Sequence, residues 1–338
     1  TLSLHDALPI SDRHLTDNMK AFWNVLSKHN HRKVSSTLTA KQLGDFYKNI
    51  MGSNANEVLP DNQKHIQTFV DEKIRELKDV EHDFNISPAA VNRMIRSLNT
   101  NSAPGCDGIT AEHLMWGNSE ILCRHLAQIY QCMFTLKIVP DVIKLGVIAP
   151  QLKKAHLDPN DPNSYRPITL SSIHSKLIEC FLIPNDDVSD VQFGYRKSRS
   201  TEFACAYLHD VITDFNSSGS PVFICGLDAN KCFDTVWHDG LFYKLWSRIP
   251  TSHWIYLVTW YRNLKAMVKW NKQISDIFTV TIGTRQGSIL SPKLFNIFIN
   301  DLLIELRNSS YGLKIGSHLH NCFAYADDIT LFASTTSQ

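Results

Sequence analysis

Two adjacent aspartates stand between two short apolar segments near the carboxyl end of the sequence. Residues 322–325 and 329–332 form these segments, and Ala326, Asp327 and Asp328 separate them. The pattern predicts a β-hairpin whose turn holds two carboxylates against a hydrophobic core. Neighbouring carboxylates repel each other, and their charge is unfavourable beside a core unless a divalent cation compensates it. The pattern thus favours a rigid metal-binding hairpin, although paired aspartates also occur in ordinary surface turns.

A third carboxylate follows another apolar segment. Residues 221–227 predict a buried, β-branched strand, and Asp228 stands at its carboxyl end. Asp is equally typical of a helix N-cap at such a place. If this strand lies beside the hairpin, three carboxylates can hold two Mg²⁺ ions about 4 Å apart. Such ions align an attacking 3′-hydroxyl with the α-phosphate of a nucleotide and stabilise the leaving pyrophosphate.

Apolar spacing predicts the other helices and strands. The expected helices cover residues 66–77, 88–98 with Ser87 as N-cap, 110–133 with Leu122, Leu126, Ile129 and Met133 inward, 241–249, 254–264, and one from Pro292 with Leu294, Ile297, Phe298 and Leu302 inward. The expected strands cover residues 145–149 and 277–282, and residues 155–167 are expected to form a loop. Residues 11–85 carry no recognisable chemical motif and predict a helical extension or a linker.

Basic and acidic residues nearly balance over the chain. There are 34 Lys and Arg against 33 Asp and Glu, a net charge of +1 that argues against a polycationic tail protein. Residues 241–300 hold eight basic residues and one acid, Asp276, interleaved with Trp and Tyr. This segment suits a surface that follows phosphates and stacks bases. A solvated helix face above buried aromatic side chains is the alternative.

The eight cysteines show neither a CxxC pair nor zinc-finger spacing, so we expect reduced thiols. The sequence contains no signal peptide, no other targeting signal and no apolar run long enough to cross a membrane. We therefore expect an intracellular protein without a membrane partner. The first ten residues, TLSLHDALPI, resemble a translated adapter sequence and are set aside.

Six sequence blocks occur in a characteristic order. They are SAPGCDGI at 102–109, VIAPQLKK at 147–154 with NSYRPITL at 163–170, QFGYRKSRST at 192–201, LDANKCFDTV at 227–236, TRQGSILSP at 284–292 and FAYADD at 323–328. Together they resemble the reverse transcriptase domain of non-LTR (LINE-type) retrotransposons, over about residues 88–336. Cys106, Cys232 and Gln151 depart from residues common in that family, and none of them replaces a catalytic group.

The resemblance implies an α+β fold of the right-hand polymerase type. Residues 86–222 would form the fingers, residues 223–338 a truncated palm with an antiparallel sheet that carries the catalytic aspartates, and residues 1–85 an N-terminal extension. The thumb would be absent. The implied activity is RNA-directed DNA polymerase, with two Mg²⁺ ions or Mn²⁺ as cofactor. The implied partners are an RNA template, a DNA primer and dNTPs, with an endonuclease domain upstream in the intact polyprotein and a location in nucleus and cytoplasm.

The resemblance also assigns roles to single residues. Catalysis and metal binding fall to Asp228, Asp327 and Asp328, with the backbone carbonyl of Ala229 as a further metal ligand. Nucleotide binding falls to Arg166 with Lys153 or Lys154, Phe233, Gln286 and Gly287. Template and primer binding fall to Arg196, Lys197, Arg199 and Tyr325.

The chemistry of these side chains suits the implied roles. The planar guanidinium of Arg166 matches phosphate oxygens, and the ring of Phe233 is bulky enough to exclude a ribose 2′-hydroxyl. Gly287 allows a close approach of the backbone. Two other identities stay open: a group II intron-type maturase reverse transcriptase, and a catalytically silent nucleic-acid-binding remnant of a retroelement.

Overall fold

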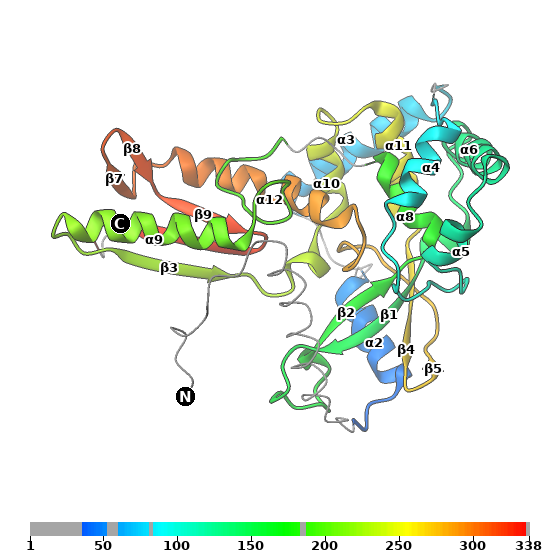
Figure 1. Ribbon diagram of the computed structural model, residues 1–338, viewed down its shortest axis with the longest axis horizontal. Helices are drawn as coiled ribbons and strands as arrows, with labels where there is room; N and C mark the ends of the chain where they lie inside the picture. The colour runs from blue at the N-terminus through cyan, green and yellow to red at the C-terminus, as the bar shows by residue number, and fades with distance from the viewer. Residues whose placement is uncertain (1–35, 53–59, 81–83, 183–186, 336–338) are drawn as a thin grey trace.

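The computed structural model describes residues 36–52, 60–80, 84–182 and 187–335 (Figure 1). The first half of the chain forms α2 (Ala40–Met51), α3 (Asp61–Leu77), α4 (Pro88–Arg96), α5 (Ala111–Trp116), α6 (Glu120–Thr135), α7 (Asp141–Lys144), β1 (Leu145–Leu152), the short 3-10 helix η1 (Pro162–Ser164), β2 (Tyr165–Leu170) and α8 (Ile173–Leu182). The second half forms α9 (Thr201–Ser217), β3 (Phe223–Asp228), the 3-10 helix η2 (Cys232–Thr235), α10 (His238–Leu245), α11 (Thr251–Tyr261), β4 (Lys265–Trp270), β5 (Gln273–Ile274), β6 (Phe278–Thr279), α12 (Ser291–Asn308), β7 (Leu313–Ile315), β8 (His318–His320), β9 (Cys322–Tyr325) and β10 (Asp328–Ala333).

The first sheet joins strands that are far apart in the sequence. Its order is β2-β1-β4-β5, with β6 also paired to β4. Strands β1 and β4 run parallel, and the other pairs are antiparallel. Helix α2 packs against β4 and β6, so a helix from the N-terminal part of the chain covers this sheet (Figure 1).

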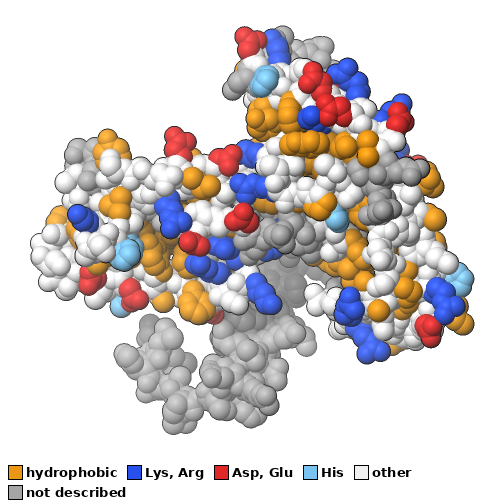
Figure 2. All heavy atoms as spheres, turned by 90° about the horizontal axis from the view of Figure 1, so that it is seen from above, with side chains coloured by type: hydrophobic (Ala, Val, Ile, Leu, Met, Phe, Trp, Pro, Cys, Tyr) orange, Lys and Arg blue, Asp and Glu red, His pale blue; other side chains and the backbone are white. Residues whose placement is uncertain are grey.

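The main hydrophobic core fills the space between this sheet and the helices from α2 to α8 and from α10 to α12. Its largest fully buried side chains include Trp254, Tyr256 and Trp260. The aromatic residues of α11 therefore belong to the core. For this helix the structure supports the alternative interpretation of segment 241–300, namely buried aromatic side chains rather than a base-stacking surface. Figure 2 shows basic side chains mixed with acidic ones on the visible face, in keeping with the near-zero net charge.

The second sheet is antiparallel and lies apart from the first, in the order β3-β10-β9 (Figure 1). Its two faces pack against different helices because side chains alternate along a strand. Phe323 and Phe332 join residues of α9, whereas Ala324 and Ile329 join Leu303 of α12. The predicted hairpin is thus confirmed, with Asp328 as the first residue of its second strand.

The predicted burial of the strand before Asp228 is wrong. Strand β3 begins at Phe223, and all its residues are exposed. Its side chains Ile224 and Leu227 are 48% and 44% exposed, since it is the edge strand and the clusters around α9 and α12 are built on β9 and β10.

Several predicted boundaries also differ from the structure. The helix expected over 110–133 is two helices, because Ser119 caps a new start at α6. Ile129 and Leu302, expected inward, are exposed. The loop expected up to Pro167 already forms strand β2 from Tyr165 onward, and the strand expected over 277–282 is reduced to β6.

The structure agrees with the predicted α+β class. It mixes helices with strands, and Asp228 and Asp328 lie in an antiparallel sheet. All eight cysteines are free thiols, as predicted. None of the helices described is long and apolar enough to span a membrane.

Candidate active site

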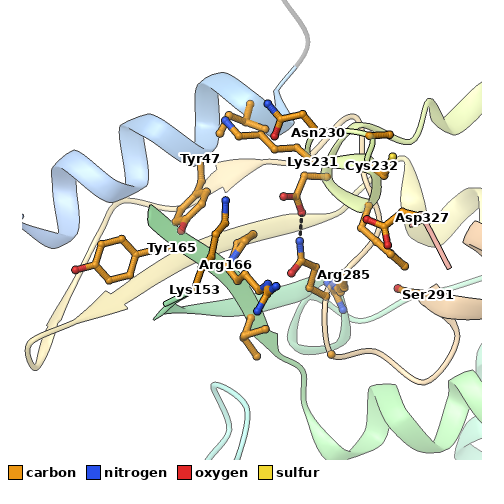
Figure 3. A pocket seen from close by; sticks show the side chains of 18 of the residues that line it. Tyr47, Lys153, Tyr165, Arg166, Asn230, Lys231, Cys232, Arg285, Ser291 and Asp327 are labelled. Carbon is orange, nitrogen blue, oxygen red and sulfur yellow. Dashed lines mark hydrogen bonds between the residues drawn. The ribbon is translucent and has the colours of Figure 1, made fainter. Parts of the chain in front are cut away.

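Residues of both sheets line a cavity of about 580 Å³. The predicted residues in its wall are Lys153, Arg166, Asp228, Ala229, Phe233, Gln286, Gly287 and Asp327. Figure 3 shows Lys153, Arg166 and Asp327 in this wall, on different elements of the structure. The predicted residues Lys154, Arg196, Lys197, Arg199, Tyr325 and Asp328 are all described but do not line this cavity.

Strand register brings the three aspartates together. Asp228 at the end of β3 pairs with Asp328 at the start of β10, and Asp327 precedes it in the hairpin turn. Partial burial raises the pKa of Asp327, and the carboxylates of Asp328 and Asp228 raise it further. The further rise reflects repulsion of the Asp327 carboxylate by the other two. The oxygen atoms of all three are ligands that suit a hard divalent cation. Among the described residues, no three His, Cys, Asp or Glu side chains form a ready metal cluster.

The side chain of Gln192 binds the backbone of the hairpin turn through hydrogen bonds. Its Oε1 accepts hydrogen bonds of 2.8 Å from the backbone N–H groups of Ala326 and Gly194, and its Nε2 donates to the carbonyl of Ala326. Ala326 has a φ of 59°, in the left-handed region. A Cβ on Gly194 would lie 2.3 Å from the Ala326 nitrogen, so this approach requires glycine. Sequence block 192–201 therefore fixes the position of Asp327.

Two cations reach the cavity from the paired strands β1 and β2. Gln151 pairs with Arg166, and the backbone N–H of Lys153 donates to the carbonyl of Ser164. This register directs Lys153 and Arg166 into the cavity (Figure 3). The structure therefore places Lys153 rather than Lys154 beside Arg166, a choice that the sequence left open.

Helix η2 and the loop before α12 form one unit at the cavity floor. The Phe233 ring stacks on Phe295, with ring centroids 4.2 Å apart. The Gln286 amide donates a 2.7 Å hydrogen bond to Asp234 Oδ1, and burial raises the pKa of Asp234 to about 6. The backbone N–H of Thr284 donates to the carbonyl of Phe233. These contacts fix Phe233 and Gln286 relative to each other.

Backbone contacts also explain the glycine next to Gln286. Gly287 has a φ of 107°, and a Cβ there would lie 3.0 Å from the carbonyl oxygen of Thr169. Thr169 in turn donates its N–H to the carbonyl of Gln286 at 2.7 Å. The loop therefore lies directly against strand β2, as the prediction of close backbone approach requires.

The side chains predicted to contact template and primer have internal partners. Arg196 donates to the carbonyls of Ser189 and Gln192. Arg199 donates to the carbonyl of Asp190 and lies over the Phe193 ring. Lys197 is exposed, and the Tyr325 hydroxyl accepts a hydrogen bond from Thr201. The two arginines thus brace the segment before α9, and the template and primer roles of all four residues stay predictions.

Sequence reasoning missed the contribution of α2 and of Lys231 to the cavity. Phe46, Tyr47 and Ile50 of α2 line it, as do Lys231 and Asn163. Helix α2 had a usable signal, because Thr39 and Gln42 form a capping box. That signal predicts a helix but does not reveal that the helix packs near residues more than 180 positions away.

Comparison with known proteins agrees with this constellation. Residues 152–338 match the sequence model of the family described as reverse transcriptase (RNA-dependent DNA polymerase), which covers more than half of the chain. The chain is 29% identical, over 80% of its length, to the probable RNA-directed DNA polymerase from transposon BS of Drosophila melanogaster. It is 27% identical over 73% of its length to the RNA-directed DNA polymerase from mobile element jockey of Drosophila funebris.

A third relative is the Pol polyprotein from type-2 retrotransposable element R2DM of Drosophila melanogaster, 26% identical over 70% of this chain. This chain spans 31%, 27% and 22% of the lengths of these three relatives, respectively. The relatives carry the names of mobile elements, which confirms the predicted resemblance to retrotransposon proteins.

Proposed function

Because the chain belongs to the reverse transcriptase family, we propose that it joins deoxynucleotides to a primer 3′-hydroxyl on an RNA template. One observation carries the proposal. Two carboxylates, two cations and an aromatic ring from separate blocks of the sequence surround a single cavity, namely Asp228, Asp327, Lys153, Arg166 and Phe233. These are the groups that nucleotidyl transfer needs around a bound nucleoside triphosphate.

The reverse transcriptase family uses divalent metal ions, and the residues present fit such ions. Asp228 and Asp327, with the backbone carbonyl of Ala229, offer hard oxygen ligands in the cavity wall. Asp328 lies opposite Asp228 in the sheet and would act from outside the cavity wall. When bound, two Mg²⁺ ions would activate the primer hydroxyl and stabilise the charge on the leaving pyrophosphate, with Mn²⁺ as an alternative.

The protein side chains account for binding and orientation of the nucleotide. Lys153 and Arg166 would hold the triphosphate, since Arg binds phosphate with a planar fork and Lys with a point charge. The Phe233 ring, held by Phe295, would lie under the sugar and exclude a 2′-hydroxyl. Gln286 and Gly287 would contact the nucleotide and the template base.

The finer architecture is part of the same proposal. Residues 86–222 would form the fingers, with strands β1 and β2 near the triphosphate, and residues 223–338 would form the palm around the second sheet. Strands β4, β5 and β6 of that second segment complete the first sheet. An endonuclease domain upstream, as part of a longer polyprotein, and a location in nucleus and cytoplasm are also proposed. Template-directed extension by this chain is the part of the function that an experiment can test directly.

The test is primer extension by the 338-residue chain on an RNA template with dNTPs and Mg²⁺. We expect Asp327→Asn to reduce incorporation by about a thousandfold or more, because it removes a charged ligand of the reacting centre. Asp210→Asn is the matched control, since Asp210 lies on α9 with 83% of its side chain exposed. Full activity in Asp327→Asn, or a wild-type chain that binds neither primer–template nor dNTP, would contradict the proposal.

A further inference from the structure

We propose that Lys231 is a third phosphate-binding cation and that helix α2 positions it through Phe46. The inference rests on the proposed function, because it assigns a ligand to one wall of the same cavity. It concerns two residues to which neither the sequence blocks nor the family resemblance gave a role. The helix is part of the segment in which the sequence showed no chemistry.

Lys231 lines the cavity three residues after Asp228 and is partly buried. In Figure 3 its side chain extends from its turn toward α2. The ammonium donates a 3.0 Å hydrogen bond to Asn163 Oδ1 and lies 5.0 Å from the centre of the Phe46 ring. An ammonium has three N–H donors. After these two contacts, the ammonium of this cavity-lining residue keeps N–H donors for a ligand.

The partner amide is oriented by contacts of its own. The side-chain and backbone N–H groups of Asn163 both donate to Asp161 Oδ1, at 3.0 and 2.9 Å. These bonds leave the carbonyl oxygen of the Asn163 side chain to face Lys231. The fingers-side loop and the turn after β3 are therefore joined at the position of the ammonium.

The backbone at Lys231 is also unusual. Its φ of 56° lies in the left-handed region, which lysine rarely adopts. Hydrogen bonds from the N–H of Asp234 and the hydroxyl of Thr235 to the Lys231 carbonyl hold this conformation. Strained backbone of this kind is concentrated at functional sites, where the surrounding structure enforces it. Here it directs a lysine across the cavity mouth.

Charge indicates the class of ligand. Within the described residues, Lys231 makes no ion pair. Burial raises the pKa of Asp234 in the same wall, and the Lys231 ammonium offsets only part of that rise. Lys153 and Arg166 enter the same cavity from the β1–β2 side and join Lys231 there. Arg285 also lines the cavity, but its guanidinium donates to the backbone carbonyls of Ile143 and Lys144. The triphosphate is the most highly charged part of a nucleotide, and lysine binds phosphate as a compact charge. The phosphates, rather than the base or sugar, are the group that this arrangement fits.

Helix α2 is firmly attached to the sheet behind it. The indole N–H of Trp270 donates to the carbonyl of Leu38, just before the helix. At the other end, the N–H of Thr281 donates to the carbonyl of Met51 at 2.8 Å. Leu43 and Tyr47 are buried in the core between these ends. The Phe46 ring is thus a fixed platform for the ammonium, through a cation–π contact.

The experiment compares binding of dTTP and dTMP to the 338-residue chain with Ca²⁺, which supports binding without turnover. We expect Lys231→Met to weaken dTTP binding by about ten- to a hundredfold, the effect of one charge-assisted hydrogen bond. Binding of dTMP should change less than about twofold. Lys231→Arg should retain most of the affinity for dTTP, because it keeps the charge. Phe46→Leu should weaken dTTP binding by about threefold, since it removes the platform but leaves the cation.

Lys41→Met is the matched control, because Lys41 is an exposed lysine of α2 outside the cavity wall. Far-UV circular dichroism checks folding, and Lys231→Gln replaces Lys231→Met if the latter does not fold. Unchanged dTTP binding in the folded variant, or equal loss of dTTP and dTMP binding, would overturn the inference while leaving the proposed function intact. A wild-type chain that binds no dTTP would also overturn the inference, and one that binds neither dTTP nor primer–template would overturn the proposed function as well.

Discussion

The sheet that carries the aspartates has two unlike sides. The hairpin of β9 and β10 lies between α9 and α12, and Phe323 and Ile329 are buried against them. Strand β3 is paired with β10 along one edge only, and it is exposed along its whole length. Asp327 is therefore positioned by packing on both faces of its hairpin, together with the three hydrogen bonds of Gln192.

Asp228 is positioned in another way. Its strand contributes little packing, but the chain is partly buried at residues 231–233 and buried at Asp234 in η2. There Phe233 and Asp234 are bound to the loop before α12 through Thr284 and Gln286. Two carboxylates of one site are thus held by different forces. One depends on hydrophobic packing, and the other depends on a polar contact at the end of an exposed strand.

The largest expected difference is in the free energy of unfolding. Phe323→Ala should destabilise the chain by about 3–5 kcal/mol, because it removes a buried ring that packs against α9. Ile224→Ala on β3 should cost less than about 1 kcal/mol, since that side chain is 48% exposed. Urea denaturation of both variants measures the difference. Equal losses would show that β3 is packed as firmly as the hairpin.

The buried carboxyl of Asp234, which follows β3, should make the free energy of unfolding depend on pH. Burial raises the pKa of Asp234 to about 6 in the folded protein, above its ordinary value of 3.8. The unfolded chain then releases this proton first, so the stability that this group contributes is fully present below pH 3.8 and is lost as the pH rises to about 6. The loss amounts to about 3 kcal/mol at one pKa unit per 1.36 kcal/mol.

Asp234→Asn should remove that part of the pH dependence, since the amide does not ionise but can still accept from Gln286. Denaturation midpoints of the wild type and the variant at pH 4 and pH 7 check this, with Asp210→Asn as the exposed control. A wild type and an Asp234→Asn variant with parallel pH profiles would show that this carboxyl titrates normally.

The smallest expected effect concerns the selectivity for the nucleotide sugar, which we assign to Phe233 of η2. Phe233→Ala should lower the preference for dNTP over rNTP by about ten- to a hundredfold, because it opens space under the ribose. Phe295→Leu should lower it less, since the gating ring remains but loses its stacking partner. Single-nucleotide incorporation with each substrate measures both. Unchanged selectivity in Phe233→Ala would remove the sugar-gate role.

Features with a local cause were predictable from the sequence. The hairpin followed from alternating apolar residues around a turn, and Ser87 caps α4 by accepting from Ala90, as its position before Pro88 indicates. The convergence of Asp228, Asp327, Arg166 and Phe233 on one cavity also agrees with the motif order. In each case the deciding residues are close together or belong to one motif.

Features decided by distant parts of the chain were not predictable in this way. The apolar composition of β3 indicates burial, but burial depends on which helices cover its edge of the sheet. The position of α2 depends on β4, more than 200 residues later. Similarly, Arg199 looks like a free cation in the sequence, but its guanidinium lies over the Phe193 ring.

The position of α2 has a consequence for synthesis of the protein. The cavity combines Phe46 with Asp327, so its wall is complete only after about 280 further residues have left the ribosome. At roughly 5–20 residues per second, that interval lasts about 14–56 seconds. For most of this time α2 lacks β4, the strand against which it packs. The cavity is therefore one of the last parts of the nascent chain to form, and its folding must await contacts of high sequence separation.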